Sequence, residues 1–260
     1  MKNKRYLFLG LICFLVMQSC ASIKEYPVTK KVSQVDLLHG VEIEDPYRWL
    51  EDFTSEEVEI WVGLQNNLSK KYLKRNKYKK RIKENLESIW VSDSKSIPQT
   101  RGDNIFYFFN DGSWEQSKLM KQECVGCLPE VIIDPNTFSN DGTISLSNLS
   151  ISPNGKFIAY SISDGGSDWK TWKVLDVGSN QVLENSIKWT KFSSGSWEAD
   201  SSGFYYQKYP EPKEVALSEI NKSPKLYFHK IGTTQQEDIL IYDQPDKPNW
   251  SWNIEASEDG

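Results

Sequence analysis

Several residues and motifs on which common enzyme classes depend are scarce or missing in this sequence of 260 residues. It contains only two histidines, His39 and His229, so a histidine-rich metal site is not expected. No glycine-rich phosphate loop and no HExxH helix occurs in the chain. The formal net charge of −5 argues against a nucleic-acid partner, because phosphate binding requires a basic surface. No cofactor or metal is therefore implied.

The sequence also lacks an apolar run long enough to cross a membrane comfortably. Its most apolar stretch, residues 6–17, is short and follows a basic start, which predicts a secretory signal peptide over residues 1–19. Cys20 lies between two small residues, where a bacterial lipoprotein signal places its acylated cysteine. A lipid on Cys20 would attach the protein to a membrane surface, in the periplasm or cell envelope of a Gram-negative-type bacterium. The alternatives are a plain signal peptide or an uncleaved anchor, with Cys20 incidental.

Cysteine is scarce beyond Cys20, where only Cys124 and Cys127 remain. A single CxxC pair lacks the second pair that a zinc site would need, and no βαβ pattern surrounds it. The intervening Val125-Gly126 is turn-like and lies between two strand-like runs. We expect a small disulfide loop or free thiols here, with a redox or metal role as the weaker alternative.

Helical periodicity is confined to residues 54–90. Apolar residues recur there at helical spacing, which predicts helices with one apolar face. Thr54 is the predicted N-cap, with Glu57 three positions later completing a capping box. The apolar positions are Val58, Trp61, Leu64, Leu68, Tyr72, Leu73, Ile82, Leu86, Ile89 and Trp90.

After Val91 the pattern changes to short aromatic and β-branched runs separated by turn signals. Aromatic residues make up 13% of the chain, and strands favour them. The main predicted strands are residues 105–109, 157–162, 171–175, 204–207, 226–229 and 239–242.

These turns and strands repeat along the chain. A glycine turn precedes an aromatic strand at Gly102, Gly155 and Gly203, and a similar turn at Gly260 starts another copy, with spacings of 53, 48 and 57 residues. Repeats of about 50 residues that each hold several short strands are typical of a β-propeller. Three copies and the start of a fourth cannot close a ring, since propellers have about four to eight blades. We therefore expect a mostly β fold containing a partial propeller, in a fragment of a longer protein.

A set of motifs in this order resembles the prolyl oligopeptidase family. The most specific is Asp45-Pro-Tyr-Arg-Trp-Leu-Glu-Asp52, which follows His39-Gly40-Val41. Weaker matches continue over nearly all of residues 26–260. They include Asn110-Asp111-Gly112, Asp134-Pro135-Asn136-Thr137, Asp141-Gly142-Thr143, Ser152-Pro153-Asn154-Gly155-Lys156 and Gly166-Ser167-Asp168-Trp169.

This resemblance implies a serine peptidase with two domains, an α/β-hydrolase and a seven-bladed propeller that restricts access to short peptides. Residues 20–91 would be the N-terminal segment of the hydrolase domain, and residues 92–260 would be an incomplete propeller domain. The implied partners are short proline-containing peptides and the protein's own C-terminal hydrolase domain.

The catalytic residues are not expected within these 260 residues. An α/β-hydrolase needs a nucleophilic serine on a G-x-S-x-G elbow, and no such elbow occurs here. His39 lies in the first motif and His229 in a predicted strand, so neither has a plausible catalytic role. The resemblance offers Phe192, in Lys191-Phe192-Ser193, as a side chain directed at the substrate pocket. A structural packing role is its alternative, and Ser251 stands at a second pocket position where relatives often carry an apolar residue.

The leading hypothesis is the N-terminal portion of a serine endopeptidase that hydrolyses short peptides after proline. A non-catalytic propeller lipoprotein that acts as a binding module is the alternative. A family member whose hydrolase has lost its nucleophile is a third possibility. The Asp45–Asp52 motif favours the first, because a free-standing propeller has no use for it or for the helices that follow.

Overall fold

A computed structural model describes residues 26–183, 186–212 and 221–257. The predicted signal peptide and Cys20 lie outside these residues. The chain divides into two compact units, residues up to 85 and residues 86–260, each described by itself. Among the described residues, no helix is long and apolar enough to span a membrane.

The first unit begins with a hairpin of β1 (Val35–Leu38) and β2 (Val41–Glu44). Its two turn residues, His39 and Gly40, have φ angles of 51° and 81°. Positive φ at both central residues is the geometry of a tight hairpin turn whose twist matches that of the strands. His39 is thus a surface turn residue.

The motif Asp45–Asp52 forms a turn held by one arginine. The guanidinium of Arg48, at the start of the 3-10 helix η1 (Arg48–Glu51), bonds to Asp45 at 2.6 Å and also to Asp36 of β1. The hydrogen bonds that Arg48 donates to Asp45 and Asp36 raise the pKa of Arg48, and the bond that Asp36 accepts from Arg48 lowers the pKa of Asp36. The most specific motif of the sequence therefore has a structural role in joining the hairpin to the helices.

Two helices follow, α2 (Glu56–Lys74) and α3 (Lys79–Trp90). The predicted cap at Thr54 is wrong by one residue. Ser55 is the N-cap, and its hydroxyl accepts a hydrogen bond from the backbone N–H of Val58 at 3.2 Å. Thr54 is instead held in the preceding turn, where its hydroxyl donates to Asp52 at 2.8 Å.

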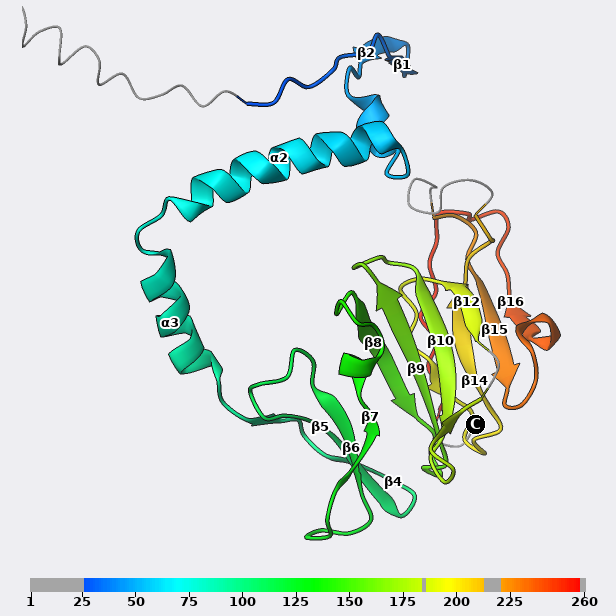
Figure 1. The fold of residues 1–260 in the computed structure, drawn as a ribbon. Coiled ribbons are helices and arrows are strands. Elements are labelled where there is room, and N and C mark those ends of the chain that lie inside the picture. Colours follow the sequence, from blue (N-terminus) through cyan, green and yellow to red (C-terminus); the bar gives the residue numbers. More distant parts are fainter. Residues whose placement is uncertain (1–25, 184–185, 213–220, 258–260) are drawn as a thin grey trace, which may run out of the picture. The chain divides into compact units, whose positions relative to one another are not determined.

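The second unit is built from three antiparallel sheets that follow one another along the chain (Figure 1). The first contains β3 (Ser94–Lys95), β4 (Gln99–Arg101), β5 (Asn104–Asn110), β6 (Lys118–Gln122) and β7 (Glu130–Ile133). The second contains β8 (Ile144–Ile151), β9 (Phe157–Asp164), β10 (Lys170–Asp176), β11 (Gln181–Val182) and β12 (Ile187–Thr190). The third contains β13 (Ser196–Trp197), β14 (Gly203–Lys208), β15 (Lys225–Lys230) and β16 (Ile239–Tyr242).

The 3-10 helix η2 (Pro135–Thr137) follows β7, and η3 (Gln235–Glu237) lies between β15 and β16. In the second and third sheets the strands along the main path pair in sequence order, and in the first sheet both β3 and β4 pair with β5, which is followed by β6 and β7. Pairing of strands that are consecutive in sequence is typical of the blades of a propeller. All six main predicted strands are present, and the mostly β fold is confirmed.

The hydrophobic cores lie between successive sheets. Strand β9 contributes side chains to both cores. Ile158 and Tyr160 pack in the core shared with the first sheet, whereas Ala159 between them packs in the core shared with the third sheet. Side chains alternate between the two faces of a strand, so a sheet enclosed on both sides needs apolar residues at consecutive positions. The second core is rich in aromatic rings, with Trp172, Trp197, Phe204 and Tyr206.

Turns of adjacent sheets also touch directly. A Cβ atom added to Gly102 would lie 2.3 Å from the carbonyl oxygen of Asn154, and one added to Gly155 would lie 2.3 Å from that of Arg101. Only glycine fits this reciprocal approach of two backbones. In the third copy the equivalent left-handed residue is Ser201, with φ of 63°, two positions before the glycine that marks the repeat in the sequence.

Candidate functional site

Phe192, the candidate substrate contact, lies in the segment that joins β12 to β13. Its φ angle is 50°, and that of Trp189 three residues earlier is 61°. Both values belong to the left-handed region, which is rare for residues other than glycine, asparagine and aspartate. The Phe192 side chain is 62% exposed. The backbone therefore adopts a costly conformation here, and the aromatic ring that it carries is not part of a core.

The residues on either side of Phe192 are buried. Lys191 is 5% exposed, and its ammonium donates to Asn221 Oδ1 at 2.7 Å and lies 4.0 Å from the ring centroid of Trp169. Burial lowers the pKa of Lys191, and the negative charge of Asp168 partly opposes this shift. An ammonium over an indole ring gains electrostatic stabilisation that increases when water is excluded. The exposed phenyl ring is thus flanked by a fixed, buried cation.

The indole ring of Trp169, over which this cation lies, contacts two further aromatic rings. Trp169 contacts Trp189 edge-on at 5.6 Å between centroids, and Tyr209 edge-on at 6.4 Å. Such edge-to-face pairs are favourable because the positive ring edge meets the negative ring face. Burial also raises the pKa of Tyr209, with a smaller opposing effect of its hydrogen bond from Gln207. The cluster offers apolar surface and one positive charge, and it contains no nucleophile with an adjacent base.

The second predicted pocket position, Ser251, is exposed. The next residue, Trp252, is anchored on two sides, since its backbone N–H donates to Gln207 Oε1 at 2.6 Å and its indole N–H donates to the carbonyl of Pro224 at 2.9 Å. Gln207 also donates to the carbonyl of Lys191 at 3.3 Å. The structure therefore brings the segments that carry Phe192 and Ser251 to a single buried amide, which the sequence analysis missed.

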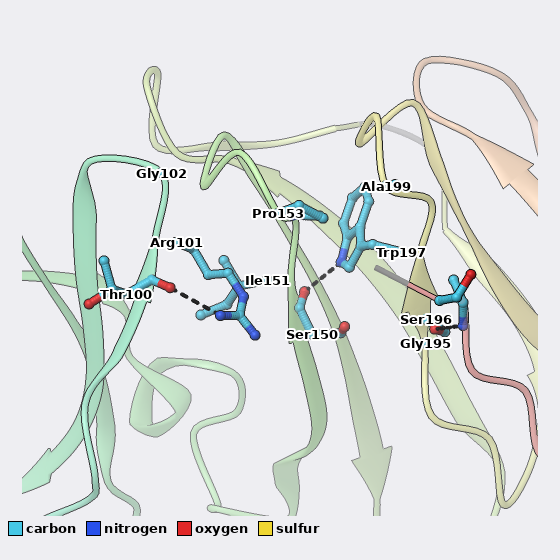
Figure 2. A pocket seen from close by; sticks show the side chains of 12 residues that line it. Thr100, Arg101, Gly102, Ser150, Ile151, Pro153, Gly195, Ser196, Trp197 and Ala199 are labelled. Carbon is cyan, nitrogen blue, oxygen red and sulfur yellow. Dashed lines mark hydrogen bonds between the residues drawn. The ribbon is translucent and has the colours of Figure 1, made fainter. Parts of the chain in front are cut away.

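A cavity of about 440 Å³ is lined by residues of β4, β8 and β13, one strand from each of the three successive sheets (Figure 2). Its wall includes Arg101 from β4, Ser150 from β8 and Trp197 from β13. The indole N–H of Trp197 donates to the carbonyl of Ser150 at 3.0 Å and so links two of these strands. The serines of this wall have no histidine beside them, and Arg101 is its one ionisable side chain. The cavity can admit a polar ligand, but it offers no acid–base chemistry.

The two histidines take different places. His39 is in the β1–β2 turn, whereas His229 is buried in β15 and its Nδ1 lies 2.7 Å from Asp238 Oδ1. The other oxygen of Asp238 accepts a hydrogen bond from the hydroxyl of Tyr206 at 2.5 Å. Burial and the Asp238 carboxylate raise the pKa of Tyr206 above its usual value. This network joins β14, β15 and the residue that precedes β16, and it lacks a nucleophilic serine, so we interpret it as structural.

The remaining candidates lie apart from Phe192. Cys124 and Cys127 form a disulfide between β6 and β7, with their Cα atoms 5.2 Å apart. Cys20 lies outside the described residues. Within the described ranges, no group of three or more histidine, cysteine, aspartate or glutamate side chains could hold a metal ion.

Comparisons with known proteins identify this arrangement of sheets. A family model described as the N-terminal β-propeller domain of prolyl oligopeptidase matches residues 26–260. The chain belongs to the prolyl oligopeptidase family. It is 40% identical to a prolyl endopeptidase of Elizabethkingia meningoseptica over 222 residues, which are 85% of this chain and 31% of that protein. It is also 31% identical to a dual-function macrocyclase-peptidase of Amanita bisporigera, covering 90% of this chain and 36% of the relative.

Solved structures of family members agree with the fold. A prolyl endopeptidase analysed for inter-domain dynamics in catalysis and specificity superposes with a TM-score of 0.82 at 30% identity, over 91% of this chain and 35% of that one. Prolyl oligopeptidase B from Galerina marginata, bound to a 35-residue hydrolysis and macrocyclization substrate, gives a TM-score of 0.77 at 30% identity over 91% and 36% of the two chains. The chain thus spans about a third of the length of these relatives, and their catalytic domain is not covered.

Proposed function

We propose that this chain is the N-terminal portion of a serine endopeptidase that hydrolyses short peptides after proline, with the propeller restricting access to the active site. The observation that carries the proposal is the 40% identity to a prolyl endopeptidase over 85% of the chain. The catalytic serine, aspartate and histidine would come from a hydrolase domain outside the 260 residues. In that domain the serine would attack the peptide carbonyl, with histidine as general base, to form an acyl-enzyme.

The helices support the hydrolase part of this proposal. Helix α2 carries apolar side chains one turn apart, Ile60 and Leu64, that are about half exposed in the described part of the chain. A helix with one apolar face gains its stability chiefly by packing that face on another element. We infer that the hydrolase domain is this element, and that further blades complete a seven-bladed propeller.

Phe192 would be the propeller's contribution to substrate binding. Its ring is exposed, its backbone is held in a left-handed conformation, and its neighbours in sequence are buried. These features support a ring presented to a ligand. At the position of Ser251, the hydroxyl would leave one wall of the pocket more polar than in many relatives.

The test is hydrolysis by the full-length gene product. We expect cleavage of a blocked peptide that carries a chromophore after proline, at least tenfold faster than cleavage of the alanine analogue. A serine-directed inhibitor should abolish the reaction, and the 260-residue chain alone should hydrolyse neither peptide. Equal rates for the two peptides, or turnover that resists the inhibitor, would contradict the proposal.

We further propose that the protein is a lipoprotein of the bacterial cell envelope, acylated on Cys20. The basic start, the short apolar run and the small residues beside Cys20 support this. Expression in a Gram-negative host should give membrane-associated protein, and Cys20→Ala should release it or stop processing. A mature protein whose intact mass shows an unacylated N-terminus would rule out the lipid.

A further inference from the structure

Gln207 in β14 is a buried amide whose polar atoms hold two separate segments and also contact Tyr209, two residues further along the chain. It is 1% exposed. Its side-chain Nε2 donates to the carbonyl of Lys191 at 3.3 Å and, more weakly, to the hydroxyl of Tyr209 at 3.4 Å. Its Oε1 accepts from the backbone N–H of Trp252 at 2.6 Å. Every strong hydrogen-bonding atom of this side chain is thus used within the protein.

The backbone of Gln207 completes a clamp around Phe192. Pairing of β13 with β14 ends at Ser196 and Tyr205. Beyond that point the N–H of Gln207 donates to the hydroxyl of Ser193 at 2.8 Å, and Ser193 is itself buried. Phe192 therefore lies between two residues, Lys191 and Ser193, that are both fixed to the same residue of β14.

This clamp explains how an exposed phenylalanine keeps a left-handed backbone. Such a conformation is unfavourable for a residue with a Cβ atom, and it persists only where the surroundings hold it. The Phe192 ring is too exposed to supply the holding energy through packing. The hydrogen bonds at Lys191 and Ser193 provide it instead.

The hydrogen bond from the backbone N–H of Trp252 to Gln207 Oε1 connects the amide to the segment that carries Ser251. Trp252 follows Ser251 directly, and its ring contacts Tyr242 edge-on at 4.9 Å between centroids. A shift of the Gln207 amide would therefore move the segment of Phe192 and the segment of Ser251 relative to one another.

We propose that Gln207 is a positioning residue for the peptide substrate, because it fixes Phe192 and Ser251 in one relative orientation. This inference rests on the proposed peptidase function. Contacts remote from the bond being cleaved stabilise the ground state and the transition state alike, so their loss raises KM more than it lowers kcat.

The experiment uses Gln207→Leu in the full-length protein, with Gln116→Leu as the matched control. Gln116 also bridges backbone groups of a neighbouring strand, donating to the carbonyl of Ile144 at 3.0 Å and accepting from the N–H of Leu146 at 3.3 Å. We expect Gln207→Leu to raise KM for a proline-containing peptide five- to tenfold and to change kcat less than twofold. Gln116→Leu should leave both constants unchanged.

A double-mutant cycle separates positioning from a general loss of stability. If Gln207 acts through Phe192, Gln207→Leu should have little further effect on KM in a Phe192→Ala background. Fully additive effects, or an equal rise of KM in Gln116→Leu, would overturn the proposal. If Gln207→Leu does not fold, Ser193→Ala takes its place in the same cycle, because it removes the hydrogen bond between Ser193 and the backbone of Gln207.

Hydrogen–deuterium exchange gives a readout that does not need activity. Amides of residues 190–194 should exchange faster in Gln207→Leu than in the wild type or in Gln116→Leu. Unchanged exchange would overturn the clamp even in an active enzyme. Faster exchange in a protein that hydrolyses no prolyl peptide would support the clamp and refute the peptidase function on which its role in substrate binding depends.

Discussion

The helical unit and the β unit of this chain differ in how they bury their apolar residues. Among the described residues up to 85, Val58 is the one fully buried hydrophobic side chain, although α2 and its flanks are rich in apolar residues. The β unit places whole aromatic rings such as Trp172 and Phe204 out of contact with solvent. Amphipathic helices depend on a partner for stability, whereas successive sheets cover one another as the chain proceeds.

The largest effect should come from a core residue of the β unit. Phe204→Ala removes a ring that contacts Trp172, Trp197 and Tyr206, and we expect it to lower the free energy of unfolding of the 260-residue chain by about 3–5 kcal/mol. Leu64→Ala in α2 should cost less than about 0.5 kcal/mol, because that side chain is 48% exposed. Urea denaturation followed by tryptophan fluorescence measures both. Similar losses of unfolding free energy in the two variants would show that the Leu64 side chain is buried by another part of the chain.

Leu64→Gln tests whether a hydrolase domain covers the helix. Leucine and glutamine have similar helix propensities, so the change should be nearly neutral in the 260-residue chain. In the full-length protein we expect a loss of about 2–3 kcal/mol, the usual cost of removing a buried leucine from an apolar contact. The control is Lys71→Gln on the same helix, which should be neutral in both proteins. Neutrality of Leu64→Gln in the full-length protein would refute packing of this face on the hydrolase.

Ion pairs of the two units should also differ in how much they contribute to stability. In the β unit, Asp134 accepts from Lys118 at 2.8 Å, and both side chains are largely buried. Burial alone would raise the pKa of Asp134, but hydrogen bonds from Lys118 and Asn136 outweigh it and hold this pKa below its usual value. In the helical unit, Lys30 and Glu57 pair at 2.9 Å while about half exposed.

We expect Asp134→Asn to cost about 1 kcal/mol at neutral pH, and Glu57→Gln less than about 0.5 kcal/mol. Because the folded-state pKa of Asp134 is depressed, its contribution is complete above the unfolded value of about 4 and is lost as the pH falls through the folded value. The difference in unfolding free energy between wild type and Asp134→Asn should therefore shrink below about pH 4. A difference that stays constant down to pH 2 would contradict this assignment.

An exposed residue of the β unit should matter for binding instead of stability. We expect Phe192→Ala to raise KM for longer peptides severalfold, with a smaller change in kcat, and to leave the melting temperature unchanged. Phe53→Ala, which truncates a ring of equal exposure in the first unit, is the control and should leave KM unchanged. Unchanged kinetics with a lower melting temperature would instead assign Phe192 a packing role.

The strands were predictable wherever aromatic and β-branched residues are contiguous. The predicted run at residues 239–242 matches β16, and the run at 157–162 extends by two residues in β9. Strand β8 was missed because its apolar alternation changes phase at an irregularity between Leu146 and Asn148. Strands as short as β13, with two residues, carry no periodicity at all.

The candidate site was less accessible to sequence reasoning. Phe192 came from a family resemblance, since nothing in its local sequence indicates a left-handed backbone. Gln207 lies in a strand as a polar residue next to a lysine, which predicts a solvent-facing position, yet tertiary contacts bury it. Asp238 is nine residues from its partner His229, and only the fold brings them together.

The smallest effect should follow removal of the Cys124–Cys127 disulfide, which lies in the β unit but outside both of its cores. A bond that closes so short a loop restricts the unfolded chain little, and the turn is also held by a backbone hydrogen bond from Cys127 to Cys124 at 3.1 Å. We expect replacement of both cysteines by serine to cost about 1 kcal/mol or less in urea denaturation and to leave kcat/KM of the full-length protein unchanged. A severalfold loss of peptidase activity in the double variant, with the wild-type stability retained, would show that this loop takes part in function. Such a result would show that the β unit carries a functional loop at residues 124–127, although neither of its cores depends on that loop.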